Sequence, residues 1–169
     1  NESEFLGDFG IRSLSKAHEK PYTIQINGDT FGIKYEPAES TTNMFGGNSN
    51  WRGPIWMPMN YLFISTFKEY HNYYKDNLKY AYPSGSDNHL NLKEIGFEIS
   101  KRLIQIFAED KKGNRPVNAI HQKQYTDEHF KELILFYEYF DGNNGRGLGA
   151  SHQTGWTALV ANLIEEINR

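Results

Sequence analysis

The sequence predicts a mostly α-helical fold with one short β-hairpin near the N-terminus. Three observations support this fold class. Apolar residues recur at three- and four-residue spacing in four stretches after residue 56, two alternating runs flank Asn27-Gly28, and no strand–helix–strand alternation is visible. The 169 residues suffice for one domain with its own core, and we find no internal repeat or domain boundary.

The hairpin is expected at about residues 22–35. Residues 22–26 and 31–35 alternate between apolar and polar side chains around Asn27-Gly28, a strong turn signal. Asp29 and Thr30 are expected to make the loop longer than two residues. The rest of residues 1–50 is expected to be irregular and to include a long loop over residues 36–50, and long loops tend to be functional or disordered.

The first two helices carry clear start signals. One is expected over residues 57–76, with Pro58 in the first turn, where a missing backbone N–H costs nothing. The other begins at Asn91, and Glu94 three residues later predicts a capping box. Their apolar faces consist of Leu62, Phe63, Phe67, Tyr70 and Tyr74 in the first, and Ile95, Ile99, Leu103 and Ile106 in the second.

Two further helices are expected towards the C-terminus, so that residues 57–169 form a mainly helical region. Thr126 is the predicted cap of a helix that runs to about Glu138, and Thr154 or Gly155 begins the last one. The predicted apolar faces are Phe130, Leu133, Ile134 and Tyr137, and then Leu159, Val160, Leu163, Ile164 and Ile167.

Composition excludes several functional classes. A net charge of −3 gives no basic surface for nucleic acid, and no apolar run approaches the ~20 residues that span a bilayer. The absence of cysteine excludes disulfides and thiolate metal sites and fits a cytoplasmic protein. The six histidines are scattered, and no cofactor motif is present, so we expect neither metal nor cofactor. The chain begins with Asn1 rather than Met, so we expect a piece of something longer.

A first candidate site lies just before the first predicted helix. Trp51, Arg52 and Trp56 fall within six residues, followed by the free N–H groups of a helix start. The two indoles could pack on sugar faces, and the guanidinium could bind hydroxyls or orient a carboxylate. In the alternative, both tryptophans anchor the loop in the core and Arg52 caps a helix.

A second candidate site surrounds Glu138, which is expected at a helix C-terminus followed by a glycine-rich loop with His152 and Trp156. A carboxylate there faces the negative end of the helix dipole, and such unfavourable placement often marks a group held for chemistry. In the alternative, Glu138 is a solvated surface residue and His152 a structural one. Asp141-Gly142-Asn143-Asn144-Gly145 lacks the full calcium-loop pattern, so we expect an ordinary turn.

Both stretches resemble glycoside hydrolase family 63, which contains processing α-glucosidases and related bacterial glucosidases. The resemblance covers nearly the whole chain and rests on residues 50–56 with Asn60-Tyr61, on Glu138, and on residues 145–157. It implies the C-terminal portion of an (α/α)6 barrel and an inverting reaction on α-glucosidic bonds. Glu138 matches the general base. Trp51, Arg52, Trp56, His152 and Trp156 are the candidate substrate-binding residues.

The chain also departs from the family pattern. The family's general acid is an Asp far upstream of the base, and we find no counterpart of its segment here. The barrel needs twelve helices, whereas this sequence predicts about four. We therefore expect part of a longer, cytoplasmic bacterial enzyme that is inactive alone and binds an oligosaccharide or α-glucoside. Helix faces that lack barrel neighbours would favour self-association.

Two alternatives remain open. One is a non-catalytic carbohydrate-binding or structural helical module, which would keep the tryptophans but need no carboxylate. The other is a fragment of a trehalase-like enzyme, because family 37 trehalases share the looser pattern of a Glu, a glycine-rich loop and a Gly-Trp-Thr helix start.

Overall fold

The computed structural model describes residues 1–42 and 49–169; residues 43–48, within the loop expected at 36–50, lie outside the described part. The described chain is helix-rich and contains four two-stranded antiparallel hairpins. The hairpins are β1 (Leu6–Gly7) with β2 (Gly10–Ile11), β3 (Tyr22–Ile26) with β4 (Asp29–Ile33), β5 (Lys79–Ala81) with β6 (His89–Asn91), and β7 (Tyr139–Phe140) with β8 (Gly147–Leu148).

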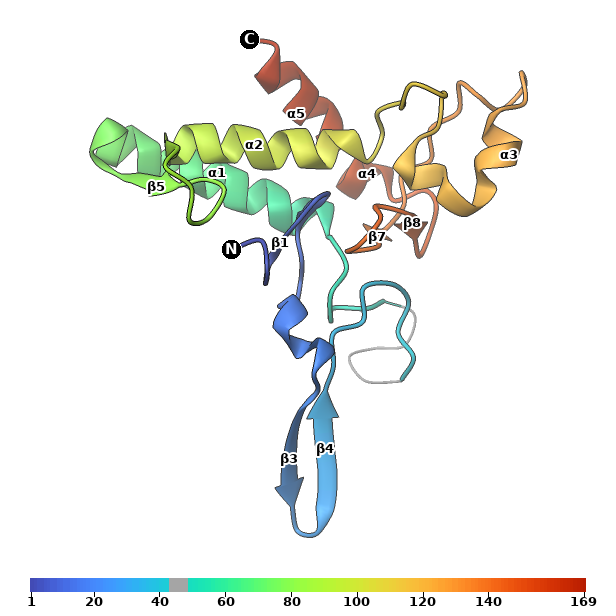
Figure 1. Cartoon of the computed structure of the whole chain (residues 1–169). Coiled ribbons are helices and arrows are strands. Elements are labelled where there is room, and N and C mark those ends of the chain that lie inside the picture. The colour runs from blue at the N-terminus through green and yellow to red at the C-terminus, as the bar shows by residue number, and fades with distance from the viewer. Residues whose placement is uncertain (43–48) are drawn as a thin grey trace.

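Helices α1 (Met57–Tyr74) and α2 (Leu92–Gln105) lie side by side and form the main layer of the fold (Figure 1). The first two predicted helices are therefore confirmed. Ile64 from α1 packs in one core with Ile99 and Leu103 from α2. The buried face of α1 differs from its most apolar stripe, because Leu62, Phe63, Tyr70 and Tyr74 remain exposed and Phe67 is half-buried.

The start of α2 has the predicted capping box. The Asn91 side-chain oxygen accepts a hydrogen bond from the Glu94 backbone N–H at 2.9 Å, and a Glu94 carboxylate oxygen accepts one from the Asn91 N–H at 2.8 Å. Two of the N–H groups that every helix start leaves without a partner are thus satisfied by local sequence alone.

The helix predicted over residues 126–138 is wrong. α3 (Gln122–Tyr125) ends where that helix was expected to begin, and turns follow it. The backbone of residues 136–140 pairs with distant segments instead: Gln153 N–H donates to the Phe136 carbonyl, and Phe140 exchanges two hydrogen bonds with Ile55. Short helices depend on packing for stability, and the expected apolar face finds none, since Phe130, Leu133 and Ile134 are exposed.

The last predicted helix is present but divided in two. α4 (Thr154–Thr157) and α5 (Leu159–Ile167) meet at Ala158. Val160 and Leu163 face the core as expected, whereas Ile164 is exposed. Residues 106–153, between α2 and α4, contain only one 3₁₀ helix (Pro116–His121), α3 and the β7–β8 hairpin, so the region after residue 57 is less helical than the sequence predicts.

The β3–β4 hairpin projects from the body as an arm (Figure 1). Its loop is the minimal two residues, Asn27 and Gly28, because Ile26 pairs directly with Asp29. The expected lengthening by Asp29 and Thr30 is therefore wrong. Both loop residues have positive φ angles, 52° and 90°, which match the right-handed twist of a hairpin.

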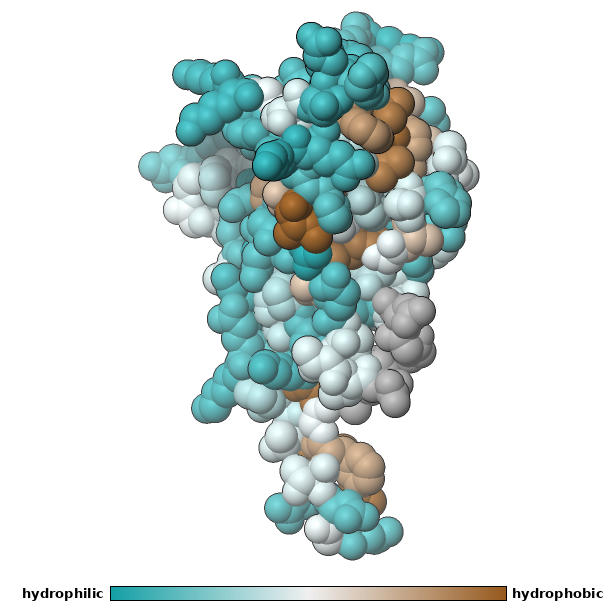
Figure 2. Space-filling view, turned by 90° about the vertical axis from the view of Figure 1, so that its right-hand side faces the viewer, coloured by the Kyte–Doolittle hydropathy of each residue, from teal (hydrophilic) through white to brown (hydrophobic). Residues whose placement is uncertain are grey.

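One face of this arm is apolar and open to solvent. The register places Ile24 opposite Phe31 and Tyr22 opposite Ile33 on the same face. Tyr22, Ile24, Ile26 and Phe31 are all exposed. Figure 2 shows the resulting hydrophobic surface on the arm, which the described body of the molecule does not cover.

Candidate carbohydrate site

Backbone pairing joins the two candidate stretches. Ile55 bridges Arg12 on one side and Phe140 on the other, and the Ile55–Phe140 pair has N···O distances of 2.8 and 2.9 Å. Successive side chains of an extended segment point to opposite sides. Ile55 and Phe140 therefore enter the main core, while their neighbours Trp56 and Tyr139 enter a second, smaller cluster.

Trp56 is the centre of a group of four packed rings, which we call the aromatic column: Trp51, Trp56, Tyr139 and Trp156. The Trp51 ring stacks on Trp56 with centroids 3.9 Å apart and planes 5° apart. Tyr139 stacks on Trp56 at 4.8 Å, and Trp156 from α4 is tilted against it at 5.6 Å. Trp56 is 1% exposed and Trp51 40% exposed, so the column ends in an accessible indole.

Glu138 lies beside the segment that carries the column. Its Oε1 accepts a hydrogen bond from Ser49 Oγ at 2.7 Å, and its Oε2 accepts one from the Ala150 N–H at 3.3 Å. The Glu138 N–H donates to the Ala150 carbonyl at 2.8 Å. Glu138 precedes β7 rather than ending a helix, so the helix-dipole argument made from the sequence does not apply.

Arg52 has protein partners on its guanidinium. It is 4% exposed, and its Nη2 lies 2.6 Å from a carboxylate oxygen of Glu36 and within hydrogen-bond distance of Ser40 Oγ. The Glu36 N–H also donates to the Arg52 carbonyl at 2.7 Å. Arg52 therefore ties the Trp51 loop to residues 36–40 in this structure. Direct contact between its guanidinium and a sugar stays a prediction.

A second ion pair, between Arg146 and Glu39, lies near Tyr139. Arg146 Nη2 lies 3.0 Å from Glu39 Oε2, and the Glu39 side chain is largely exposed. Burial, reinforced by the nearby Glu39 and Glu138 carboxylates, raises the pKa of Tyr139 to about 12. The column therefore carries a neutral phenol at physiological pH.

A groove of about 490 Å³ opens at the exposed end of the column. Trp51 and Trp56 line it together with Met59, Phe63 and Phe67 from α1, and Glu138 is not among its lining residues. Ring faces of this kind offer rigid apolar area. One face of the Trp51 ring stacks on Trp56, and the exposed part of the same ring borders the apolar groove.

Of the residues predicted from sequence, Trp51, Trp56 and Trp156 meet in the column, and Arg52 and Glu138 lie on the loops around it. His152 is exposed, and its Nδ1 lies 3.4 Å from Ser151 Oγ. Sequence reasoning missed Tyr139, Ser49, Glu36 and Glu39. Tyr139 could have been found from its place beside Glu138, but nothing local marks Ser49, because its partner lies 89 residues away.

The residues around Asp141 form a turn, as expected. One Asp141 oxygen accepts from the Asn143 N–H at 2.8 Å and the other from the Asn144 side-chain amide at 3.1 Å. Among the described residues, no group of three or more His, Cys, Asp or Glu side chains could hold a metal ion.

Comparison with known proteins places the chain in a family of glycoside hydrolases. The sequence model of the glycosyl hydrolase family 63 C-terminal domain matches residues 1–166. The chain belongs to this family.

Three relatives come from yeasts. An uncharacterized protein of Saccharomyces cerevisiae is 46% identical over 170 residues, which cover 99% of this chain and 16% of that protein. A probable mannosyl-oligosaccharide glucosidase of Schizosaccharomyces pombe is 28% identical over 98% of this chain and 14% of its own length. The mannosyl-oligosaccharide glucosidase of Saccharomyces cerevisiae is 32% identical over 71% of this chain and 11% of its own length.

This chain thus spans about a sixth of these relatives or less. Their sources lend no support to the bacterial branch that the sequence resemblance favoured. Within the described residues, every helix is too short or too polar to cross a membrane.

Proposed function

We propose that this chain is the C-terminal part of an inverting α-glucosidase-like glycoside hydrolase, in which it supplies the general base, Glu138, and one wall of the sugar pocket. The observation that carries the proposal is the pair of donors on this carboxylate. Ser49 and Ala150 each donate to one oxygen, and Ser49 lies on the same loop as the exposed indole of Trp51. Family membership supports the reaction class.

The chemistry needs two carboxyl groups. In this scheme Glu138 takes a proton from water, and the water oxygen bonds to the anomeric carbon as the bond to the leaving oxygen breaks. A carboxylic acid on the opposite side of the sugar, roughly 6.5–9.5 Å away, protonates that leaving oxygen. We assign this acid to a segment outside the present chain. Because general acid or base catalysis contributes about 10²–10⁴-fold, the chain alone should hydrolyse little or nothing.

The aromatic column is the proposed sugar wall. Trp51 offers its exposed ring to the apolar face of a glucose unit, and Trp56 supports it from behind at 3.9 Å. Trp156 and His152 complete the wall in this proposal. Arg52, paired with Glu36, holds the loop. The names of two relatives, a probable mannosyl-oligosaccharide glucosidase and a mannosyl-oligosaccharide glucosidase, favour an α-glucosylated oligosaccharide as substrate.

The exposed stripe of α1 fits the same proposal. Leu62, Phe63 and Tyr70 are apolar and open to solvent. In the parent protein they would pack against the remaining helices of an (α/α)6 barrel, as apolar helix faces require. In isolation the same stripe would drive self-association. The cytoplasmic location expected from the sequence stays a prediction.

Glu138→Gln in the parent polypeptide tests this function. We expect kcat on α-linked gluco-oligosaccharides to fall by about 10²–10⁴-fold, with an unchanged circular dichroism spectrum. Glu132→Gln is the matched control, because Glu132 is exposed, and it should leave turnover intact. Unchanged turnover in Glu138→Gln would remove this residue from the mechanism and favour a non-catalytic carbohydrate-binding module. Preferential hydrolysis of trehalose would instead indicate a trehalase-like enzyme.

A further inference from the structure

The Glu138 carboxylate is held at both oxygens by groups from different loops. Ser49 Oγ donates to Oε1 at 2.7 Å, and the Ala150 N–H donates to Oε2 at 3.3 Å. We propose that Ser49 is a positioning residue for the general base, which fixes the direction of the Glu138 carboxylate relative to the sugar wall. This inference rests on the function proposed above.

The two bonds leave the carboxylate able to act. An ionised carboxylate offers about four acceptor positions on its two oxygens. Ser49 and Ala150 occupy one position on each oxygen, so each oxygen keeps a further position for a water molecule. Hydrogen bonds to charged groups are also stronger than neutral ones. Together the two hydrogen bonds restrain rotation of the carboxylate but leave an acceptor position for water on each of its oxygens.

The backbone beside Ala150 makes one side of this clamp rigid. Gly149 has a φ of +71°, which side chains rarely adopt, and a Cβ there would lie 2.7 Å from Glu138 Oε2. The chain can approach the carboxylate this closely because residue 149 is glycine. With the Ala150 side fixed by the backbone, Ser49 is the side-chain half of the clamp.

Ser49 also links the base to the aromatic column. It lies two residues before Trp51 on the same segment, and the next residue, Asn50, accepts the Trp56 Nε1–H on its carbonyl at 3.0 Å. A single short segment therefore supports the exposed indole and holds the carboxylate. Loss of the Ser49 hydroxyl should misdirect the base while the indole that binds sugar stays in place.

The test is the kinetics of Ser49→Ala in the parent polypeptide. We expect kcat to fall by about 10- to 100-fold, the range for losing one hydrogen bond to a charged group, with KM changed less than twofold. Ser49→Thr, which restores a hydroxyl, should recover much of the loss. Ser86→Ala, on the β5–β6 turn, is the control for a serine hydroxyl removed elsewhere, and it should match the unmodified enzyme.

A double-mutant cycle with Glu138→Gln separates the two proposals. If Ser49 acts through the carboxylate, Ser49→Ala should cost little further kcat once Glu138 is Gln. Two outcomes would overturn the positioning role and leave the base assignment standing. One is an equal loss of kcat from Ser49→Ala in the unmodified enzyme and in Glu138→Gln. The other is an unchanged kcat in Ser49→Ala when Glu138→Gln is inactive. Full activity of Glu138→Gln would remove the proposed function itself.

Discussion

The aromatic column and the β3–β4 arm are built from similar residues but end in opposite environments. In the column, Trp56 and Tyr139 are almost fully buried, because segments more than 80 residues apart pack on each other. In the arm, Ile24 and Phe31 pair across a regular hairpin and remain exposed. Local sequence can therefore specify a strand, whereas burial needs a partner from elsewhere in the chain.

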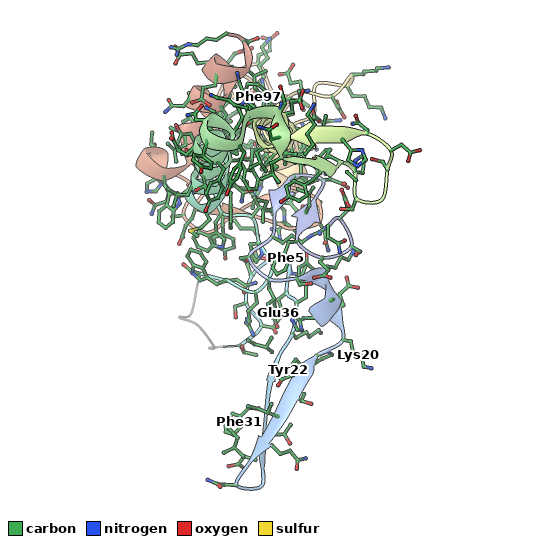
Figure 3. All side chains as sticks on the ribbon, turned by 90° about the vertical axis from the view of Figure 1, so that its left-hand side faces the viewer. Phe5, Lys20, Tyr22, Phe31, Glu36 and Phe97 are labelled. Atoms are coloured by element: carbon green, nitrogen blue, oxygen red, sulfur yellow. The ribbon has the colours of Figure 1, made fainter. Side chains whose placement is uncertain are left out.

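The base of the arm and its outer part differ in the same way. Glu36, at the base of the arm where it joins the body, is buried against Arg52, whereas Tyr22 and Phe31 lie out along the arm (Figure 3). A buried ion pair must be kept intact because neither charge can return to water. The arm carries no comparable constraint at these two rings, and its stability rests on local pairing and the Asn27-Gly28 turn.

Among changes in the aromatic column and its surroundings, Trp56→Ala should have the largest effect on stability. It removes a fully buried indole and three ring contacts, so we expect the free energy of unfolding to fall by about 3–5 kcal/mol. Trp51→Ala is the matched control. It removes one stacking partner from an exposed position and should cost about 1 kcal/mol. Urea unfolding followed by circular dichroism measures both losses of stability. Equal losses would show that Trp56 is not the packed centre of the aromatic column.

Arg52→Ala should rank next, at about 3 kcal/mol or more, because it leaves the Glu36 carboxylate buried without its cation. Arg146→Ala breaks the pair with Glu39, whose side chain is largely exposed, and should cost at most about 1 kcal/mol. The same unfolding experiment compares the two variants. A loss in Arg52→Ala no larger than in Arg146→Ala would mean that Glu36 has access to water in solution.

Phe31→Ala should have the smallest effect, within about 0.5 kcal/mol, because its ring is exposed on the arm. Phe140→Ala is the matched change in another two-stranded hairpin. Its ring is fully buried, so we expect about 3–5 kcal/mol. The urea midpoint distinguishes them, and a loss above 1 kcal/mol in Phe31→Ala would reveal that another surface covers the arm in solution.

Part of the site was predictable from local sequence. Trp51 and Trp56 are close in the chain and come just before a helix whose start the proline marks, so their common location follows from spacing. Their contact with Trp156 needed the long-range pairing of Ile55 with Phe140. The partner of Arg52 was not predictable, since Glu36 lies in an irregular loop with no periodic signal.

The sequence by itself determined the elements whose signals are local. The capping box of Asn91 and Glu94 starts α2, and Asn27-Gly28 places the hairpin turn, because these interactions join residues at most a few positions apart. The tertiary structure decided the conformation of residues 136–140, where helical spacing competed with strand pairing to Ile55 and Gly147 and lost. It also decided that Ser49 meets Glu138, because a contact across 89 residues depends on how the whole chain packs.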